Sequence, residues 1–301
     1  MPNYDDLFMN PQPNMAGDNK QFTPFDKDAW AAQKQQDRAD AFALIDATAQ
    51  RMATDPALFM DYLNVQARFD RYSVGNAILV AAQRPDMTEP ADAKAWKDKG
   101  VYVKKGESGV LVLEPGEEYQ REDGSVGVSF NAKRIFDVSQ TTSIRRKAPI
   151  VSIDPRMLIS ALIHNAPCKI EISEKMPQNV MALYKPDDKV IRIRQGLDAP
   201  AIFFSNLTQE LAHAHSDKGE YKRSQNEFTA YCVGYVICKR YNLAADAFRI
   251  DKLPERFSTM NPQQIRSELS KIRDTANTIS ANMRQFLEKA KTEKHRDDGA
   301  R

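Results

Sequence analysis

The strongest constraint on the fold is an amphipathic stretch near the C-terminus, residues 261–289. Apolar side chains recur there at the three- and four-residue spacing of one helix face. They are Ile265, Leu269, Ile272, Ala276, Ile279, Met283 and Phe286. The spacing predicts a long helix. Packing within the chain explains its apolar stripe more simply than an exposed docking surface does.

Helical periodicity also dominates the beginning of the chain. Helices are expected from about Asp28, from Pro56 and over residues 73–82. Thr54 and Asp55 are suitable caps for the second of these, and proline fits the first turn of a helix. β-Branched and apolar runs then predict strands over 101–103, 110–113, 126–130 and 134–138, with turns at 105–109 and 123–124. The first half therefore predicts helices followed by a small antiparallel sheet.

The second half again mixes helix and strand. Residues 140–149 are rich in Ser, Thr, Arg, Lys and Pro, which is typical of a linker. A helix is then expected over 155–164, strands over 169–172, 180–184 and 190–194, and two strong helices over 199–217 and 221–241. The fold class predicted for the whole chain is α+β.

Composition bounds the class of protein. The chain has 301 residues, of which 42% are apolar and 28% charged, so it can bury a sizeable core. No apolar run approaches the ~18 residues of a membrane span, and the start of the chain lacks the features of a secretory signal. Cys168, Cys232 and Cys238 are expected to be buried free thiols. These features predict a cytoplasmic protein with no membrane partner.

Residues 208–213, Thr-Gln-Glu-Leu-Ala-His, lie on the first of the two strong helices. In the zinc-peptidase pattern His-Glu-x-x-His, two histidines bind one metal and the glutamate is the general base. Glu210 and His213 match the base and the second ligand, but the first ligand is replaced by Gln209, a weak oxygen donor. His215 faces away from His213 on a regular helix and is a poor substitute. On spacing alone, a polar pair on a helix surface is the simpler explanation.

Further segments extend the comparison over most of the chain. Residues 71–85 (RYSVGNAILVAAQRP), 95–97 (AWK) with 101–110 (VYVKKGESGV), and 135–141 (IFDVSQT) resemble, in this order, the N-terminal domain of ArdC-type antirestriction proteins of plasmids and conjugative elements. Residues 209–214 (QELAHA) resemble the metallopeptidase motif of that family except at its first ligand. The resemblance implies an N-terminal domain that binds single-stranded DNA and a zincin-like domain built on a small sheet and two core helices.

The residue patterns and the resemblance together predict a division of the chain into regions. These are a flexible lead-in over 1–28, a DNA-binding domain over 29–147, a zincin-like domain over 148–258, and a C-terminal helix with a charged tail over 259–301.

The third metal ligand of the family lies on the helix that follows the motif. The matching stretch here is 223–231, where the ligand position falls on the surviving acid Glu227 or on the replaced positions Gln225 or Arg223. The resemblance implies a degenerate metal site and a vestigial general base; the residues concerned are Gln209, His213 and Glu227 for the metal and Glu210 for the base. No cofactor is therefore expected, with zinc only if the altered ligands still bind a metal, and a pseudo-metallopeptidase is favoured over an enzyme.

Binding of single-stranded DNA requires a cationic groove and aromatic faces on which bases stack. The candidates are Arg68, Arg71, Tyr72, Arg84, Lys94, Trp96, Lys97, Lys99, Lys104, Lys105, Lys133 and Arg134, with the basic run 145–147 extending the positive track. Residues 68–147 contain 14 basic and 12 acidic residues, so a mixed solvated surface is the alternative for the charges. For Trp96 and Tyr72 the alternative is core packing. Asn76 and Gln83 share a helix face and are expected to make internal hydrogen bonds rather than base contacts.

Three functions remain open at this point. The favoured one is a mobile-element protein that binds single-stranded DNA, with a host or element-encoded protein as a further partner. The second is a metallopeptidase with an altered ligand set that uses Glu210 as the base. The third is a protein-interaction module that does not bind DNA and uses the long C-terminal helix as its docking surface.

Overall fold

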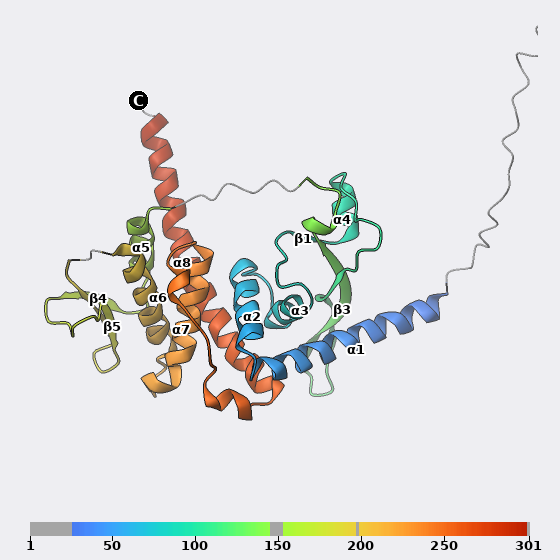
Figure 1. The fold of residues 1–301 in the computed structure, drawn as a ribbon, viewed down its shortest axis with the longest axis horizontal. Helices are drawn as coiled ribbons and strands as arrows, with labels where there is room; N and C mark the ends of the chain where they lie inside the picture. The colour runs from blue at the N-terminus through green and yellow to red at the C-terminus, as the bar shows by residue number, and fades with distance from the viewer. Residues whose placement is uncertain (1–25, 145–152, 197–198, 300–301) are drawn as a thin grey trace, which may run out of the picture.

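The computed structural model describes residues 26–144, 153–196 and 199–299 and has the predicted α+β fold (Figure 1). Its first part contains α1 (Lys27–Met52), α2 (Pro56–Arg68), α3 (Val74–Gln83), β1 (Pro90–Ala91), α4 (Ala93–Asp98), β2 (Val110–Gln120) and β3 (Val126–Asp137). Its second part contains α5 (Pro155–His164), β4 (Lys169–Ser173), β5 (Ala182–Lys185), β6 (Val190–Arg194), α6 (Pro200–Ser216), α7 (Arg223–Arg240) and α8 (Pro262–Gly299). The lead-in up to residue 25 and the basic run 145–147 lie outside the described residues.

Side-chain caps begin the N-terminal helices. Asp26, Asp55 and Ser73 accept hydrogen bonds from backbone N–H groups in the first turns of α1, α2 and α3. These N–H groups have no partner within a helix, so the caps satisfy them. Asp55 followed by Pro56 confirms the predicted boundary between the first two helices.

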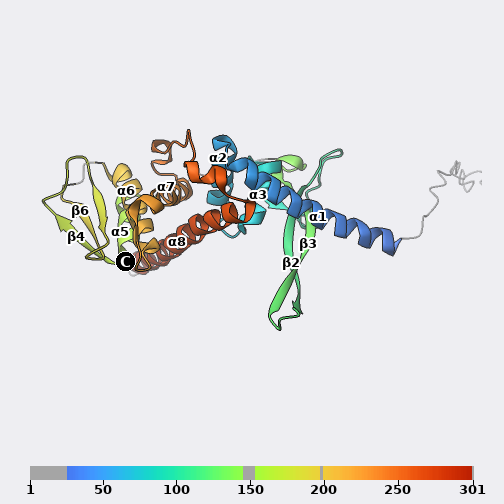
Figure 2. The same ribbon diagram turned by 90° about the horizontal axis from the view of Figure 1, so that it is seen from below.

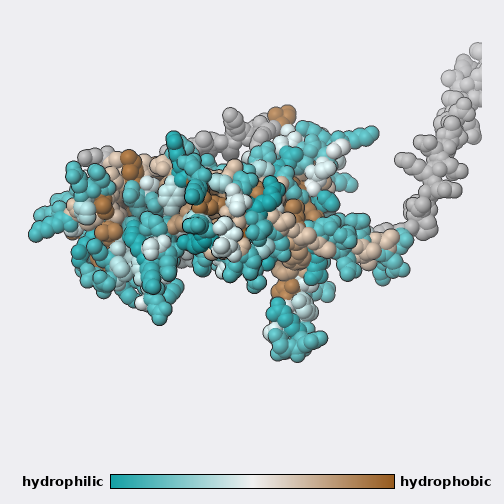
Figure 3. All heavy atoms as spheres, turned by 60° about the horizontal axis from the view of Figure 1, so that its bottom comes forward, coloured by the Kyte–Doolittle hydropathy of each residue, from teal (hydrophilic) through white to brown (hydrophobic). Residues whose placement is uncertain are grey.

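β2 and β3 form a long antiparallel hairpin that projects from the body of the molecule (Figure 2). Its turn contains Gly124 with a left-handed backbone, as the Asp-Gly pair predicts. The short β1 pairs with the other edge of β3, which gives the strand order β1-β3-β2. Figure 3 shows hydrophilic side chains at the end of the hairpin and hydrophobic ones nearer the body.

Two predictions about this sheet are wrong. The segment 101–103 is not a strand: Val103 makes one isolated bridge to Thr141, so residues 105–109 do not close a hairpin. The strands predicted over 126–130 and 134–138 are one continuous strand, β3. In both cases the strands are set by pairing between distant segments. The buried residues from Val110 onward pair with β3 and not with 101–103, and this pairing keeps β3 continuous.

The open edge of β2 is covered by two amide side chains of α3. The Asn76 amide donates to the Leu113 carbonyl oxygen at 2.7 Å and accepts from the Leu113 N–H at 2.8 Å. The Gln83 amide does the same at Leu111, at 3.0 and 2.9 Å. The two amides thus take the place of a further strand, and the prediction of internal hydrogen bonds is confirmed for both residues.

The second sheet has the order β4-β6-β5, with β4 parallel and β5 antiparallel to β6. Helix α6 packs against β5 and, more extensively, against α7. At Gly234 of α7, an added Cβ would lie 2.7 Å from Cγ of Gln209. The missing side chain therefore permits the close approach of α6 and α7.

Helix α8 joins the two parts of the molecule. It packs against α5, α6 and α7 and also against α1 and α3 (Figures 1 and 2). Ile265, Leu269, Ile272, Ala276, Ile279, Met283 and Leu287 are buried on it. The predicted packing of the stripe within the chain is confirmed, and the helix extends beyond residue 289 to Gly299. The predicted division into a DNA-binding and a zincin-like domain stays a prediction.

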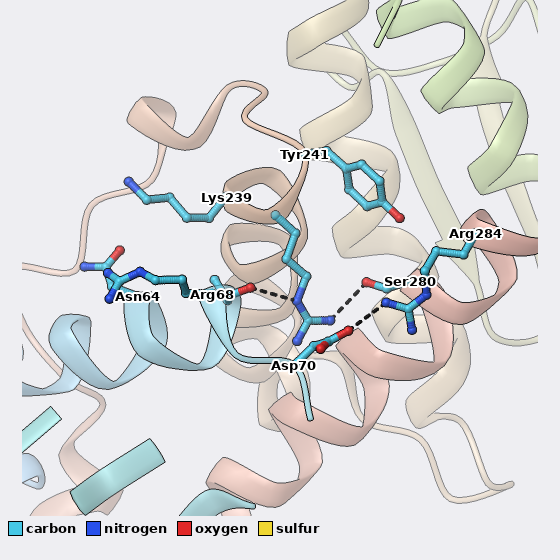
Figure 4. A pocket seen from close by; sticks show the side chains of 9 residues that line it. Asn64, Arg68, Asp70, Lys239, Tyr241, Ser280 and Arg284 are labelled. Carbon is cyan, nitrogen blue, oxygen red and sulfur yellow. Dashed lines mark hydrogen bonds and ion pairs between the residues drawn. The ribbon is translucent and has the colours of Figure 1, made fainter. Parts of the chain in front are cut away.

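Arg240 at the end of α7 ties three helices together beside a pocket of about 530 Å³ (Figure 4). Its guanidinium donates to the carbonyl oxygens of Gln66 and Ala67 in α2, and to the Ala276 carbonyl and the Ser280 hydroxyl in α8. Burial lowers the pKa of Arg240 to about 10, and the group remains charged at neutral pH.

Two further expectations concern the thiols and the membrane. Cys168, Cys232 and Cys238 are free thiols, with Cys232 and Cys238 buried and Cys168 half-buried. Within residues 26–144, 153–196 and 199–299, no helix combines the length and apolar character of a membrane span.

Candidate functional site

Helix α6 places residues 208–213, the segment that resembles the zinc-peptidase motif, at its contact with α7. Its apolar side chains Phe203, Leu207 and Leu211 are buried, which fixes the helix against the core. Glu210 and His213 are also buried, with exposed fractions of 6% and 1%. The alternative of a polar pair on a helix surface is therefore wrong. Burying such groups costs free energy unless partners satisfy them.

Glu210 is held by a backbone amide and a guanidinium. The Tyr184 N–H of β5 donates to its Oε2 at 2.7 Å. The two terminal nitrogens of Arg223, in the first turn of α7, donate to both carboxylate oxygens at 2.9 and 2.6 Å. A bidentate pair of this kind is among the strongest polar contacts in proteins. Accordingly, the hydrogen bond from Arg223 to Glu210 raises the pKa of the guanidinium.

His213 is held between Tyr221 and Glu227. Its Nδ1 lies 2.6 Å from the Tyr221 hydroxyl, and its Nε2 lies 3.5 Å from Oε2 of Glu227. Burial, followed by the charge of Arg223, lowers the pKa of His213 to about 3, so the ring is neutral at neutral pH. Burial raises the pKa of Tyr221 to about 12, so its hydroxyl keeps its proton at neutral pH. The tautomer of the neutral ring decides whether this hydroxyl donates to Nδ1 or accepts from it.

Gln209 and His215 lie away from this group of side chains. The Gln209 amide donates to the Ser205 carbonyl of its own helix at 3.1 Å, and its stem packs against Gly234. His215 lines a separate small pocket with Leu162 and Asn165. The structure thus brings together Glu210, His213 and Glu227 but leaves the first-ligand position turned to the helix backbone.

These residues do not fit a metal ion. Both oxygens of Glu210 are bound to Arg223, and Nε of Arg223 lies 3.3 Å from Oε2 of Glu227. Nδ1 of His213 is engaged by the Tyr221 hydroxyl, and its Nε2 lies beside Glu227, which Arg223 also contacts. In the described part of the chain, no cluster of three or more His, Cys, Asp or Glu side chains is arranged to hold a metal. Pinned by a cation and an amide, Glu210 is also poorly placed to accept a proton from substrate.

Sequence reasoning found Glu210, His213 and Glu227 but missed the role of Arg223 and Tyr221. Arg223 appeared only as a replaced ligand position. The signal for its role was the loss of acidic residues before Glu227 together with a basic residue four positions earlier, which places Arg223 and Glu227 on one helix face.

The aromatic candidates for DNA binding fall in different environments. Trp96 is only 4% exposed and donates its indole N–H to the Phe136 carbonyl at 2.9 Å. The packing alternative is therefore confirmed for Trp96, and a stacking role is wrong for this residue. Tyr72 is half-buried and stacked on Phe69.

Five of the ten basic candidates make hydrogen bonds or ion pairs with the protein itself. Lys133 lies 2.8 Å from Asp92 and 3.1 Å from Glu114. Further contacts are those of Arg68 with the Pro85 and Met87 carbonyls, Arg84 with Ser139 and Glu107, Lys104 with the Ser139 carbonyl, and Arg134 with Asp37. Arg71, Lys94, Lys97, Lys99 and Lys105 are exposed. The ten basic candidates are spread over α2, α4, β3 and the loops.

A groove that combines aromatic and basic side chains lies between α1 and the β2–β3 hairpin. This α1–hairpin groove encloses about 670 Å³, and its lining includes Trp30, Lys34, Arg38, Phe130 and Lys133. Trp30 is 53% exposed and Phe130 37%. Lys34 lies over the Trp30 ring at 5.9 Å from its centroid.

Helix α1 contributes one wall of this groove and was missing from the sequence-based candidates. Trp30, Lys34, Arg38 and Phe42 follow one another at intervals of four residues. Residues four apart share a helix face, so this spacing was a readable signal of an aromatic and basic stripe. Phe42 meets Phe130 edge to face, with 6.3 Å between ring centroids, which closes the inner end of the stripe against β3.

No family model and no curated protein matches the sequence. The chain is similar to two crystal structures of the antirestriction protein ArdC from plasmid R388. For the metal-free structure the TM-score is 0.47, with 15% sequence identity over 71% of this chain and 86% of that chain. For the Mn(II)-bound structure the TM-score is 0.48, with 18% identity over 74% of this chain and 97% of that chain.

Proposed function

We propose that the protein binds single-stranded DNA in the α1–hairpin groove, as an ArdC-like antirestriction factor encoded on a mobile element, and that its zincin-like helices do not hydrolyse peptides. The observation that carries the proposal is the groove itself, where exposed aromatic rings alternate with basic side chains. Base stacking on aromatic faces and cations along the phosphates are the two requirements for binding single strands without sequence preference.

The charges in the groove favour a polyanion. Among the described lining residues, Glu114 carries the one carboxylate beside Lys34, Arg38 and Lys133. Lys133 is already engaged by Glu114. Lys34 donates to the Ala132 carbonyl oxygen at 3.3 Å and Arg38 lies over the Phe42 ring, so these two cations keep their charge for phosphates. The tip of the hairpin carries Glu117, Glu118, Glu122 and Asp123. Because these acids repel phosphates, the strand is expected to follow α1 rather than the hairpin tip.

The resemblance of residues 71–85, 101–110 and 135–141 to ArdC-type proteins supports the same proposal from the sequence. Peptide hydrolysis is disfavoured by the contacts of Glu210, whose carboxylate is bound by Arg223 and by the Tyr184 amide. The two parts of the proposal are independent, since the groove and the buried polar group lie on different elements.

Fluorescence anisotropy with a short labelled single-stranded oligonucleotide tests the DNA-binding part. We expect binding that weakens steeply with salt, and a smaller salt dependence in the double variant K34A/R38A. Each phosphate contact that is lost lowers the slope of log affinity against log salt by roughly 0.7 for a single strand.

The matched control is R51A, which removes an exposed cation near the other end of the same helix. It should leave both the affinity and the salt slope unchanged. Absence of salt-sensitive binding by the wild type at low ionic strength, or equal losses in R51A and K34A/R38A, would refute the groove as the binding site.

A further inference from the structure

We infer that the guanidinium of Arg223 has replaced a metal ion as the cation of the α6–α7 site, so that restoring the first histidine would not by itself restore metal binding. The inference rests on the non-catalytic part of the proposed function and is independent of DNA binding. It concerns Arg223, Tyr221 and the three partners Glu210, His213 and Glu227.

The guanidinium of Arg223 uses all of its nitrogens on the site. All three nitrogens of the Arg223 guanidinium face a carboxylate: the two terminal nitrogens bind Glu210, and Nε lies 3.3 Å from Glu227. The group therefore spans the general base and the surviving acid of the motif. These two carboxylates come from different helices, and one planar cation holds them together.

Arg223 also balances the negative charge of Glu210. Glu210 is buried, and a buried carboxylate needs a compensating cation. Arg223 supplies that charge permanently, because a guanidinium does not lose its proton in proteins. A divalent cation entering between Glu210, His213 and Glu227 would meet a fixed positive charge already in contact with both acids. Arg223 must leave before a metal can bind.

The segment that leads into α7 supplies the partners of both Glu210 and His213. Tyr221 and Arg223 lie two residues apart where the chain enters α7. Tyr221 occupies Nδ1 of His213 while Arg223 occupies Glu210. One short segment thus satisfies both remaining members of the motif, which explains how they stay buried and hydrogen-bonded although the first ligand has become Gln209.

Zinc titration in the presence of a competing chromophoric chelator tests the inference on four full-length proteins: the wild type, Q209H, R223A and Q209H/R223A. We expect one equivalent of zinc to bind to the double variant at least about tenfold more tightly than to either single variant, and no stoichiometric binding to the wild type. Zinc should also raise the melting temperature of the double variant alone. The control Q209H/K222A removes a neighbouring exposed cation and should behave like Q209H.

R223A leaves Glu210 buried without its cation, so circular dichroism must verify folding. R223Q, which keeps hydrogen-bond donors but no charge, replaces R223A if that protein unfolds. Equal zinc affinity of Q209H and the double variant would overturn the inference, as would a folded double variant that binds no zinc. Salt-sensitive DNA binding should persist in all variants, so loss of the DNA-binding proposal and loss of this inference are distinguishable.

Discussion

The buried carboxylate of Asp137, at the end of β3, joins the residues before β1 to the turn that follows β3. It accepts hydrogen bonds from the Thr88 and Glu89 N–H groups and from both the N–H and the hydroxyl of Ser139. Gln140 donates from its amide to Glu107 and to the Ser108 carbonyl. Asp137, Ser139 and Gln140 of the IFDVSQT segment therefore stabilise the fold at this end of the sheet.

The same carboxylate predicts a pH dependence of stability. Burial of Asp137 opposes ionisation, but hydrogen bonds from Ser139, Thr88 and Glu89 outweigh it and hold the pKa of the carboxyl below its ordinary value of 3.8. A depressed folded-state pKa stabilises the protein above the unfolded-state pKa, and this stability is lost as the pH falls through 3.8 towards the folded value. D137N should lower the free energy of unfolding at pH 7 by about 1–3 kcal/mol.

Urea unfolding of the wild type and of D137N between pH 7 and pH 3 measures this contribution. The difference between the two proteins should shrink as the pH falls, because protonation removes the advantage of the carboxylate. A difference that stays constant over this range would contradict the assignment. D187N is a suitable control, since Asp187 is exposed in the turn before β6 and its side chain makes no hydrogen bond within the described residues.

At the scale of elements, the close contact of α6 and α7 depends on Gly234. Glycine inside a helix normally costs about 1 kcal/mol relative to alanine, so G234A would stabilise an exposed helix. Here the added methyl would meet Gln209 Cγ at 2.7 Å and the Phe248 ring at 3.2 Å. We expect G234A to lower the free energy of unfolding by about 1–3 kcal/mol, as overpacking does.

Thermal and urea unfolding of G234A and of Q209A/G234A check this expectation. The double variant should recover part of the lost stability, because removing the stem of Gln209 clears the shorter contact. If G234A proves more stable than the wild type, the helices are not held as closely as the structure has them.

The helices were predictable from the sequence because each carries its own signal. The 3.6-residue period, the caps Asp55 and Ser73 and the proline at the start of α2 are local features. The first sheet was less predictable, since β3 is continuous only through its pairing with β2. Within the candidate site, Glu210 and His213 could be found by spacing. The pair formed by Arg223 and Glu210 could not, because the two residues lie on different helices and meet only in the folded chain.

At the scale of the whole molecule, α8 and Arg240 connect the N-terminal helices to the helices of the second part of the chain. The guanidinium satisfies the Gln66 and Ala67 carbonyls at the C-terminal end of α2, which have no partner within that helix. R240K should lose most of these hydrogen bonds, because an ammonium group cannot reach three helices at once. The expected cost is about 2–4 kcal/mol in the free energy of unfolding, since several buried acceptors lose their donor.

Chemical unfolding of R240K beside K239A checks this prediction. Lys239 precedes Arg240 and is exposed, so K239A should change stability by no more than about 0.5 kcal/mol. If R240K is as stable as K239A, the hydrogen bonds of Arg240 to α2 and α8 are not needed for stability.

The most direct test of the central claim uses the tryptophans as reporters. The chain has two, Trp30 in the α1–hairpin groove and the buried Trp96. Bases that stack on an indole quench its fluorescence, so titration with a single-stranded oligonucleotide at low salt should quench the wild type. The quenching should reverse on addition of salt and be absent in W30F, in which Trp96 is the remaining tryptophan. Binding without quenching in the wild type, or equal quenching in W30F, would contradict the proposal that single-stranded DNA occupies this groove.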